Sequence, residues 1–323
     1  MTHSPKLSIG VPVYNGERFL PALFENLTAQ TFRDFEIVVS DNASTDQTPA
    51  ICAEWASRDP RIRYHRNPRN VGACANFNQV FELAKAPLFK WAACDDSYGP
   101  AYLEACVRIM DENPDVVLAQ TDVICVDENG KPFERDAATG HFIIPGTSLH
   151  YAIDPIDVGE SPIALKRFYD VLFRCRSNSQ IFGVVRRDAL ARTGLLPNFL
   201  GSEKATVLEL SLLGRFGQDR TPLFHRCYHP GITEVKDKSE AKTYMSMTET
   251  AYSRPVRMLT TFLAAPLSKP VGLLTKLGCF ALLGLRSVSF LFRSTLQSEA
   301  KSWPFRAAWG TAKKNQSDTC CPR

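Results

Sequence analysis

The sequence predicts an α/β protein, with a mostly parallel sheet flanked by helices on both faces and a helical C-terminal extension. Three observations support this prediction. Over the first 125 residues, short apolar runs alternate with stretches at helical spacing, which is typical of parallel sheets. Several runs end abruptly in polar clusters, as strands do at the ligand-binding edge of such a sheet. Beyond residue 235 the chain becomes apolar and basic and loses this alternation.

Strands in the alternating part are predicted where apolar and β-branched residues are bounded by turn signals such as Tyr14-Asn15-Gly16. These strands cover residues 6–13, 35–40, 61–65, 88–93 and 116–126. Helices are predicted between them, where apolar residues recur at helical spacing, at residues 19–30, 49–55, 71–84 and 100–112. Pro49 fits this interpretation because it falls in a first helical turn.

After Gly130 the pattern loosens. Residues 133–157 are rich in Pro, Gly and Asp, and we expect a long loop of the kind that is often functional. Further along, strands are predicted at 179–185 and 223–228, and helices at 188–193 and 206–213. We therefore expect a first domain over residues 1–235 and a basic, apolar helical region over residues 236–323.

The net charge of +4 is unevenly distributed. From Arg254 onward the chain has eleven basic and two acidic residues, a net charge of +9, which leaves the first 253 residues at −5. A basic surface is thus a property of the C-terminal region, and no nucleic-acid partner is expected. Within residues 271–292, Lys276 and Arg286 interrupt an apolar run too short to span a bilayer, which takes roughly 20 residues. Two alternatives remain: peripheral contact with an anionic membrane, or a helix packed on the core.

The cysteines and the N-terminus suggest a cytoplasmic protein, which could be peripheral at the inner face of the cell membrane. Ten cysteines are scattered through apolar runs without disulfide or zinc spacing, so we expect reduced core thiols. The chain starts without a basic segment followed by an apolar stretch, so no signal peptide is predicted.

Several enzyme classes lack their motifs. The sequence has no G-x-G-x-x-G after the first strand, no G-x-x-x-x-G-K-[ST], no G-x-S-x-G and no H-E-x-x-H. What it has instead are four polar clusters after the first four strands: residues 12–17, 41–46, 70–72 and 95–96. The last of these is Asp95-Asp96, two adjacent carboxylates whose repulsion is offset only by a cation or a hydrogen-bonding ligand.

Taken in order, these clusters resemble the family 2 glycosyltransferases with the GT-A fold, over residues 6 to 230. The resemblance implies a mixed, mostly parallel sheet and a nucleoside-diphosphate sugar as donor. It also implies an inverting, metal-dependent transfer to an acceptor hydroxyl, of a hexosyl- or rhamnosyltransferase type. Cell-surface polysaccharide or glycolipid synthesis is the process we expect, with a glycan or glycolipid as acceptor.

The resemblance also assigns nucleotide-binding residues. Pro12 and Tyr14 match positions that border the base, and Glu17 belongs to the same cluster. Asp41 matches the carboxylate that contacts the base or ribose. Asn70 and Gly72 match a loop that closes over the nucleotide, with Asn76 as support.

Metal and catalytic residues follow in the same way. Asp95 and Asp96 match the acidic motif, in which the second Asp binds the divalent ion, Mg²⁺ or Mn²⁺, and Asp95 contacts the nucleotide. One departure is Ala93, which stands where the family's first Asp is usual. His229 resembles a late His that reaches the metal or diphosphate in some relatives.

Inverting transfer needs a general base, and Glu203 matches its place at the start of a helix. Lys204 could pair with Glu203 and hold it ionised. Glu209, six residues further, is expected to be structural. Residues 178–180 and Gly183 resemble the floor of the acceptor pocket.

Two other interpretations compete. One is a catalytically inactive nucleotide-sugar-binding module or partner subunit, which Ala93 and the Glu at 203 leave open. The other is a sugar nucleotidyltransferase, which would need a Gly-rich loop with a basic residue after the first strand. Residues 14–17, Tyr-Asn-Gly-Glu, do not form such a loop.

Overall fold

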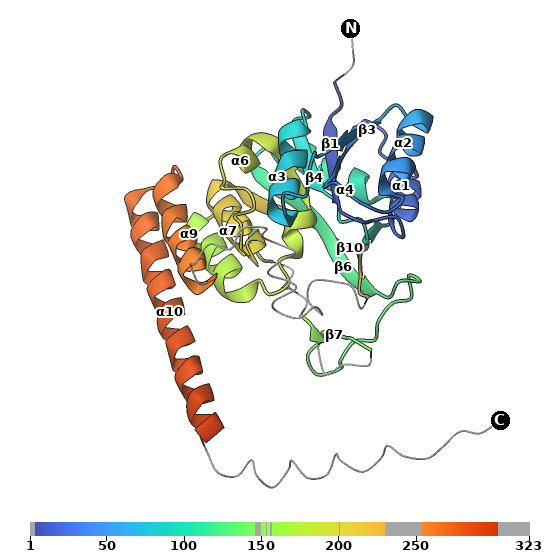
Figure 1. Cartoon of the computed structure of the whole chain (residues 1–323). Helices are drawn as coiled ribbons and strands as arrows, with labels where there is room; N and C mark the ends of the chain where they lie inside the picture. The colour runs from blue at the N-terminus through green and yellow to red at the C-terminus, as the bar shows by residue number, and fades with distance from the viewer. Residues whose placement is uncertain are drawn as a thin grey trace, which may run out of the picture. The chain divides into compact units, whose positions relative to one another are not determined.

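A computed structural model describes residues 4–145, 150–152, 154–155, 157–199, 201–229 and 254–302, with side chains of the last segment described from 257 to 287. The chain separates into two compact units, residues 1–279 and residues 280–323 (Figure 1). The boundary expected at residue 235 lies outside the described residues and stays a prediction.

One eight-stranded sheet organises the first unit, in the order β3-β2-β1-β4-β9-β6-β10-β5. Its strands are β1 (Leu7–Val13), β2 (Phe35–Asp41), β3 (Ile62–Arg66), β4 (Leu88–Trp91), β5 (Ser97–Tyr98), β6 (Val116–Val126), β9 (Val184–Arg186) and β10 (Arg215–Cys227). A separate hairpin joins β7 (Phe142–Ile143) and β8 (His150–Tyr151).

The pairing confirms a mixed, mostly parallel sheet. β1 pairs in parallel with β2 and β4, β2 pairs in parallel with β3, and β6 pairs in parallel with β10. β9 runs antiparallel to β4 and β6, and β5 runs antiparallel to β10. The carboxyl ends of β1 to β4 therefore meet at one edge, where open α/β sheets bind ligands.

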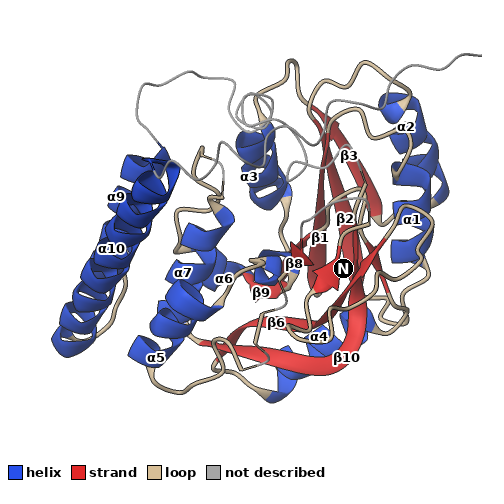
Figure 2. Ribbon diagram, turned by 90° about the horizontal axis from the view of Figure 1, so that it is seen from below, coloured by secondary structure: helices blue, strands red, loops and turns tan. Residues whose placement is uncertain are grey.

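Helices cover both faces of the sheet (Figure 2). The helices of the described residues are α1 (Leu20–Thr28), α2 (Thr48–Arg58), α3 (Ala73–Leu83), α4 (Tyr102–Glu112), α5 (Ala164–Tyr169), α6 (Arg187–Ala191), α7 (Glu203–Leu213), α9 (Arg254–Ser268) and α10 (Leu273–Ser302). Helix α9 packs against α7 and not on the sheet. A π-helical turn, η1 (Asp170–Arg174), continues α5, and a 3₁₀ helix, η2 (Ser179–Phe182), precedes β9. No helix in the described ranges is long and apolar enough to cross a membrane.

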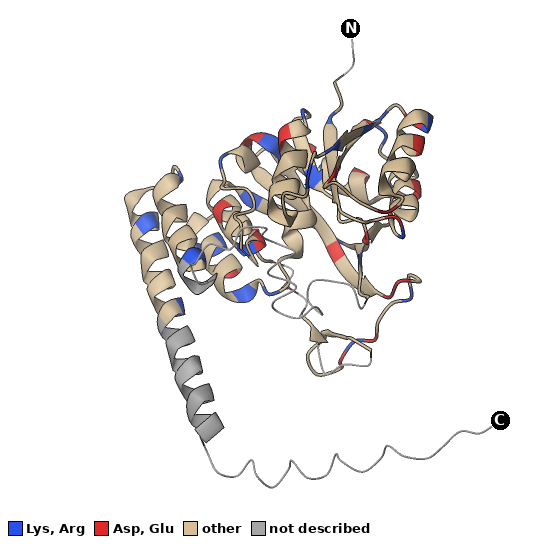
Figure 3. Ribbon diagram, in the orientation of Figure 1, with Lys and Arg blue, Asp and Glu red and all other residues tan. Residues whose placement is uncertain are grey.

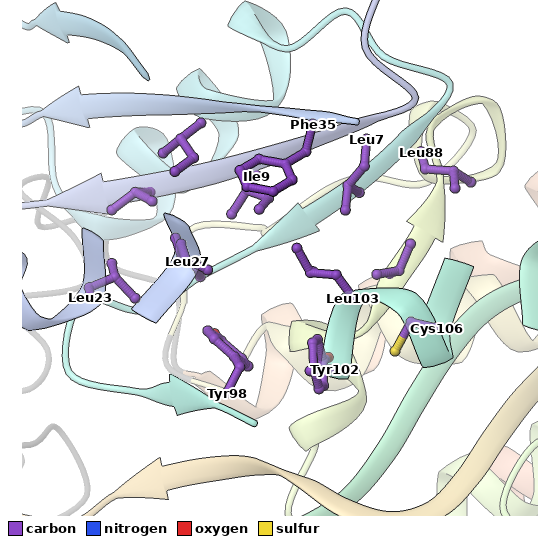
Figure 4. Close-up of a cluster of buried hydrophobic side chains, with 14 of the residues drawn as sticks. Leu7, Ile9, Leu23, Leu27, Phe35, Leu88, Tyr98, Tyr102, Leu103 and Cys106 are labelled. Atoms are coloured by element: carbon purple, nitrogen blue, oxygen red, sulfur yellow. The ribbon is translucent and has the colours of Figure 1, made fainter. Parts of the chain in front are cut away.

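Strand β1 is buried along its whole length, because helices pack on both of its faces. Its odd-numbered residues, from Leu7 to Val13, belong to a cluster with Leu23 and Leu27 of α1 and Leu103 of α4 (Figure 4). The other face of β1 meets α3 so closely that a Cβ at Gly10 would lie 2.8 Å from Val80 Cγ2. Burial on both faces makes such strands continuously apolar, which is why they could be predicted.

The second half of the sheet differs from the prediction. Residues 179–185 are not a strand: η2 occupies most of them, and only β9 at 184–186 pairs in the sheet. Gly183 lies so close to the neighbouring strand that a Cβ there would be 2.6 Å from the Ala119 carbonyl oxygen. The last strand begins at Arg215 rather than at Leu223, because its first half is partly exposed and polar and gives no hydrophobic signal.

Helices were also missed or shortened by the sequence interpretation. The helix predicted at 206–213 begins at Glu203, and α5 and η1 were not predicted. Helix α9 lies in the region predicted to be helical, residues 236–323. Within the predicted loop 133–157, a small hairpin forms instead. The eight cysteines among the described residues are free thiols, and seven of them are buried. This agrees with the expected core thiols.

Candidate functional site

The loops after β1 and β2 are locked together by hydrogen bonds. The Asn15 backbone N–H, at a residue with a positive φ of 52°, donates to Ser44 Oγ over 2.9 Å. The Glu17 N–H donates to Asp46 Oδ2 over 3.0 Å, and the Glu17 carboxylate accepts the Gln47 N–H over 2.9 Å. Glu17 therefore caps the start of α2 in this structure, and these bonds hold the exposed Tyr14 ring at the sheet edge.

Asp41, the last residue of β2, is fully buried. Its Oδ1 accepts the Ser44 N–H and its Oδ2 accepts the Tyr64 hydroxyl, each over 2.8 Å. The Arg66 Nε lies 3.6 Å from the same Oδ2. Burial, together with this carboxylate, raises the pKa of Tyr64. Asp41 thus shapes the loop, and its predicted contact with a base stays a prediction.

Asparagine side chains connect the end of β2 to the loop before α3. Asn42 Nδ2 donates to Asn70 Oδ1 over 2.8 Å, and the same oxygen accepts the Gly72 N–H over 2.9 Å. Gly72 has φ 87°, a conformation that favours glycine. The buried Asn76 amide oxygen accepts from Ser40 Oγ over 2.7 Å. Asn70, Gly72 and Asn76 therefore belong to one network at the predicted nucleotide edge.

The two carboxylates of the acidic pair differ in exposure. Asp96 is 6% exposed, and its Oδ1 accepts the Cys227 N–H over 3.0 Å. The Asp95 side chain is 25% exposed, and its Oδ2 lies 3.2 Å from His229 Nε2. His229 also packs on the Phe19 ring, with centroids 4.8 Å apart. The end of β10 thus brings His229 to the acidic pair, from 134 positions along the chain.

Burial and repulsion within the pair oppose the ionisation of Asp96. Burial, and then the charge of Asp95, raise the pKa of Asp96 to about 8, against the opposing effects of Arg226 and Lys90. Among the described residues, no three His, Cys, Asp or Glu side chains form a metal cluster. A cation held here would therefore take further ligands from phosphate oxygens or water, as Mg²⁺ commonly does. A carboxylate with phosphate oxygens and water would suit Mg²⁺, and a carboxylate together with the imidazole would suit Mn²⁺.

Lys90 is a buried cation beneath this pair that sequence reasoning did not single out. Its Nζ lies 4.0 Å from the Tyr98 ring centroid, 4.7 Å from that of Tyr102 and 5.7 Å from that of Phe224. The ammonium also donates to the Phe182 carbonyl. Burial lowers the pKa of Lys90 to about 7, whereas the rings and the carbonyl favour its charged form. The signal available in the sequence was a lysine inside an apolar strand.

Glu203 stands in the first turn of α7, at the place predicted for a base. The start of α7 adjoins α3, since Ser202 Oγ lies 3.9 Å from Cys74 Sγ. The ammonium of Lys204 donates to the Cys175 carbonyl, and its pairing with Glu203 stays a prediction.

Glu209 is structural, as expected. Its Oε2 accepts the Gly194 N–H over 2.8 Å and pairs with Lys269 Nζ at 3.1 Å. Both side chains of this ion pair are buried, and the pair joins α7 to the end of α9.

A polar cavity of about 100 Å³ opens beside β6 and η2. Its lining is rich in amides, hydroxyls and carboxylates: Gln120, Thr121, Asp122, Val123, Arg135, Tyr151, Asp154, Pro155, Ser177, Ser179, Gln180 and Gln218. Asp154 accepts the Ser177 N–H and the Gln180 amide, each over 2.9 Å. Ser179 and Gln180, from the segment predicted to form the floor of an acceptor pocket, line this cavity, and Asn178 and Gly183 of that prediction do not. Asp122 and Asp154 also line it and were not singled out from the sequence. The available signal was a polar run, 120–122, inside a buried strand.

Comparisons with known proteins agree with this geometry. The sequence profile of Glycosyl transferase family 2 matches residues 8–180, more than half of the chain. The chain therefore belongs to glycosyltransferase family 2.

Among similar proteins, the uncharacterized glycosyltransferase MJ1057 of Methanocaldococcus jannaschii is 32% identical over 128 residues, 39% of this chain and 44% of that protein. Glycosyltransferase GlyG of Streptococcus pneumoniae is 24% identical over 158 residues, 49% of each chain. The match thus spans about half, or less, of these relatives.

The fold also has counterparts among solved structures. S. aureus TarS, residues 1–349, superposes with a TM-score of 0.59 at 16% identity, covering 88% of this chain and 72% of TarS. The same protein in complex with UDP-GlcNAc gives a TM-score of 0.59 at 16% identity, covering 88% of this chain and 73% of TarS. The fold is of the GT-A type, as predicted.

Proposed function

We propose that this protein is an inverting, divalent-metal-dependent glycosyltransferase that uses a nucleoside-diphosphate sugar. The observation that carries the proposal is the acidic pair Asp95-Asp96, which stands after β4 at the edge formed by β1 to β4, with His229 beside it. Adjacent carboxylates at this edge suit a cation and a phosphate-bearing ligand.

The donor half supports this proposal through its pre-formed loops. Tyr14 is exposed beside the locked loops and offers an aromatic surface to a base, with Pro12 at the strand end below it. Asn70 and Gly72 are held at the same edge by Asn42. The fold's likeness to TarS, whose complex contains UDP-GlcNAc, supports a nucleotide sugar as ligand.

Asp96 and His229 are the residues we assign to Mg²⁺ or Mn²⁺, and Asp95 is assigned to the nucleotide. When bound, the ion supplies Lewis-acid stabilisation of the negative charge that develops on the departing diphosphate. The protein's own part is to hold the two carboxylates in place, through the Cys227 N–H on Asp96 and the His229 ring on Asp95. Asp96 must also release its proton, since burial raises its pKa to about 8.

Glu203 is the group we assign as general base, which takes the proton of the acceptor hydroxyl. The polar cavity beside η2 is our candidate for the acceptor. Its wall connects to the start of α7, because the Lys204 ammonium donates to the Cys175 carbonyl, and Cys175 Sγ lies 3.2 Å from Gln180 Oε1. Amide and carboxylate groups in such a cavity suit a hydroxyl-rich glycan.

Cell-surface polysaccharide or glycolipid synthesis remains the process we propose, with a hexose or deoxyhexose as the transferred sugar. A lipid-linked acceptor would place the reaction at a membrane, which agrees with the basic C-terminal region.

A ligand panel tests the proposal. We expect the thermal midpoint of the full chain to rise with one nucleotide sugar when Mn²⁺ is present, since a ligand at 100 times its Kd adds about 2.7 kcal/mol. Transfer or donor hydrolysis with the same compound then separates an enzyme from an inactive binding module. If no nucleotide sugar shifts the midpoint and none is turned over, the proposal is wrong.

A further inference from the structure

Helix α9 is anchored to the first unit by one face. Phe262 and Ala265 are buried, and Lys269, just after the helix, forms the buried ion pair with Glu209. The Lys269 ammonium also donates to the Arg192 carbonyl over 2.6 Å. These contacts fix the rotation of α9 about its axis, so its other sides are directed outward.

The exposed side of α9 that adjoins this buried face is apolar, although an outward helix face is normally charged. Leu259, Leu263 and Leu267 lie four residues apart along it, and Leu267 is 63% exposed. The start of α10 carries three more exposed leucines, of which Leu274 is 84% exposed. We call these six residues the leucine face: Leu259, Leu263, Leu267, Leu273, Leu274 and Leu277.

The other exposed positions around the leucine face are uncharged: Thr260, Ala264, Ser268, Pro270 and Gly272. An exposed apolar surface of this extent marks an interaction site. It combines leucines of α9 with Leu273, Leu274 and Leu277 from the apolar stretch at 271–292. We therefore expect a binding partner to cover the leucine face.

Charge favours a lipid surface as that occupant. No acidic residue occurs from Arg254 to Ser298, whereas Arg257 and Lys276 flank the leucine face. In the described part of α9 and α10, Figure 3 accordingly shows basic and neutral segments and no acidic ones. Apolar area beside basic residues, without acidic ones, matches the acyl chains and anionic headgroups of a bilayer.

We propose that the leucine face docks on the surface of an anionic membrane without crossing it. This inference rests on the proposed function, because the purpose of docking is to bring the glycosyltransferase site to a lipid-linked acceptor. Leucine side chains enter the boundary between headgroups and acyl chains, and the basic residues remain at the headgroups.

Vesicle sedimentation of the full chain tests this. We expect binding to vesicles of phosphatidylcholine mixed with phosphatidylglycerol, weaker binding to phosphatidylcholine alone, and loss of binding as salt is raised. The double variant Leu263→Ser with Leu267→Ser should bind at least about tenfold more weakly, because two exposed leucines lose their burial in lipid. Thr260→Ala, on the same helix face, is the matched control and should bind like the wild type.

Two further measurements distinguish a failure of the membrane inference from a failure of the proposed function. Asp96→Asn, which should abolish transfer, is expected to bind vesicles like the wild type, and the leucine variant should keep its nucleotide binding and thermal midpoint. Membrane binding would then stand even if the proposed function failed. Equal sedimentation of wild type and leucine variant would overturn the inference. The inference would also be overturned if the protein did not bind vesicles and instead formed a dimer that the leucine substitutions dissociate.

Discussion

The two halves of the sheet are built differently. At the donor half, β1 to β4 are parallel and regular, and their loops are fixed by short side-chain to backbone bonds such as those of Asn15 and Glu17. At the acceptor half, β9 runs against its neighbours, and β10 has register shifts against β6. A π-helical turn and a 3₁₀ helix lie nearby.

The proposed function gives this difference a reason. A rigid donor edge suits a ligand whose nucleotide and diphosphate are constant in shape. An irregular acceptor half can change its cavity by altering segments such as η2 without disturbing the parallel strands. Asp96 lies on the donor side and Glu203 on the acceptor side. Variants on the two sides compare the halves, and the largest effect is expected at Asp96.

Asp96→Asn should lower transfer at least about 100-fold, because the cation loses a carboxylate and the leaving diphosphate loses its stabilisation. The fold should survive, since the Asn amide oxygen can still accept the Cys227 N–H. Steady-state kinetics with saturating Mn²⁺ measure the loss, and circular dichroism checks the fold. Wild-type kcat in this variant would contradict the metal assignment.

Two glutamates on α7 give a matched contrast. Glu203→Gln should reduce kcat about 100-fold or more with unchanged stability, because a general base is lost. Glu209→Gln should keep kcat for the folded protein but lower the free energy of unfolding by up to about 3–5 kcal/mol, because the buried Lys269 loses its charged partner. Kinetics and urea unfolding of both variants measure the two effects. Reversed behaviour would mean that the base is misassigned.

Asp122→Asn tests the acceptor cavity. Asp122 Oδ1 accepts the Gln218 amide over 2.6 Å, and the carboxylate lines the cavity. We expect the KM for the acceptor to rise about tenfold, equivalent to 1.4 kcal/mol, with the KM for the donor unchanged. A rise in the donor KM alone would indicate that the acceptor binds outside this cavity.

The last prediction concerns the pH dependence of stability in metal-free buffer. The pKa of Asp96 is raised by burial to about 8 from an ordinary value near 3.8, so the folded state binds more protons than the unfolded state between these values. Its contribution is present at low pH and is lost as pH rises toward 8. From pH 5 to pH 7 the free energy of unfolding of the wild type should therefore fall relative to that of Asp96→Asn. Urea unfolding at both values checks this.

The contrast between the halves also explains what sequence could predict. Each donor cluster follows an apolar strand directly, so Asp41, Asn70 and Asp95 could be located by local pattern, and His229 by resemblance. Lys90 could not, because only the fold brings three aromatic rings around it. Asp154 was missed because its hydrogen-bond partners lie more than 20 positions away in an irregular segment.

The same reason accounts for the fold errors. Parallel strands buried on both faces can be predicted from their continuous apolar residues. The segment from Arg215 to Arg220 is mostly polar, and its strand pairing is with β6. Helix α5 and its π-helical extension likewise depend on tertiary contacts, such as those of Arg167, whose Nε donates to the Ser211 carbonyl over 2.7 Å.

A crystal of the full chain, soaked with manganese and a mixture of uridine, thymidine and guanosine diphosphates, tests the central claim most directly. The account predicts anomalous manganese density beside Asp95 and Asp96, with one diphosphate on the ion and its base near Tyr14. Density for a nucleotide bound away from this edge, or manganese at another site, would contradict it.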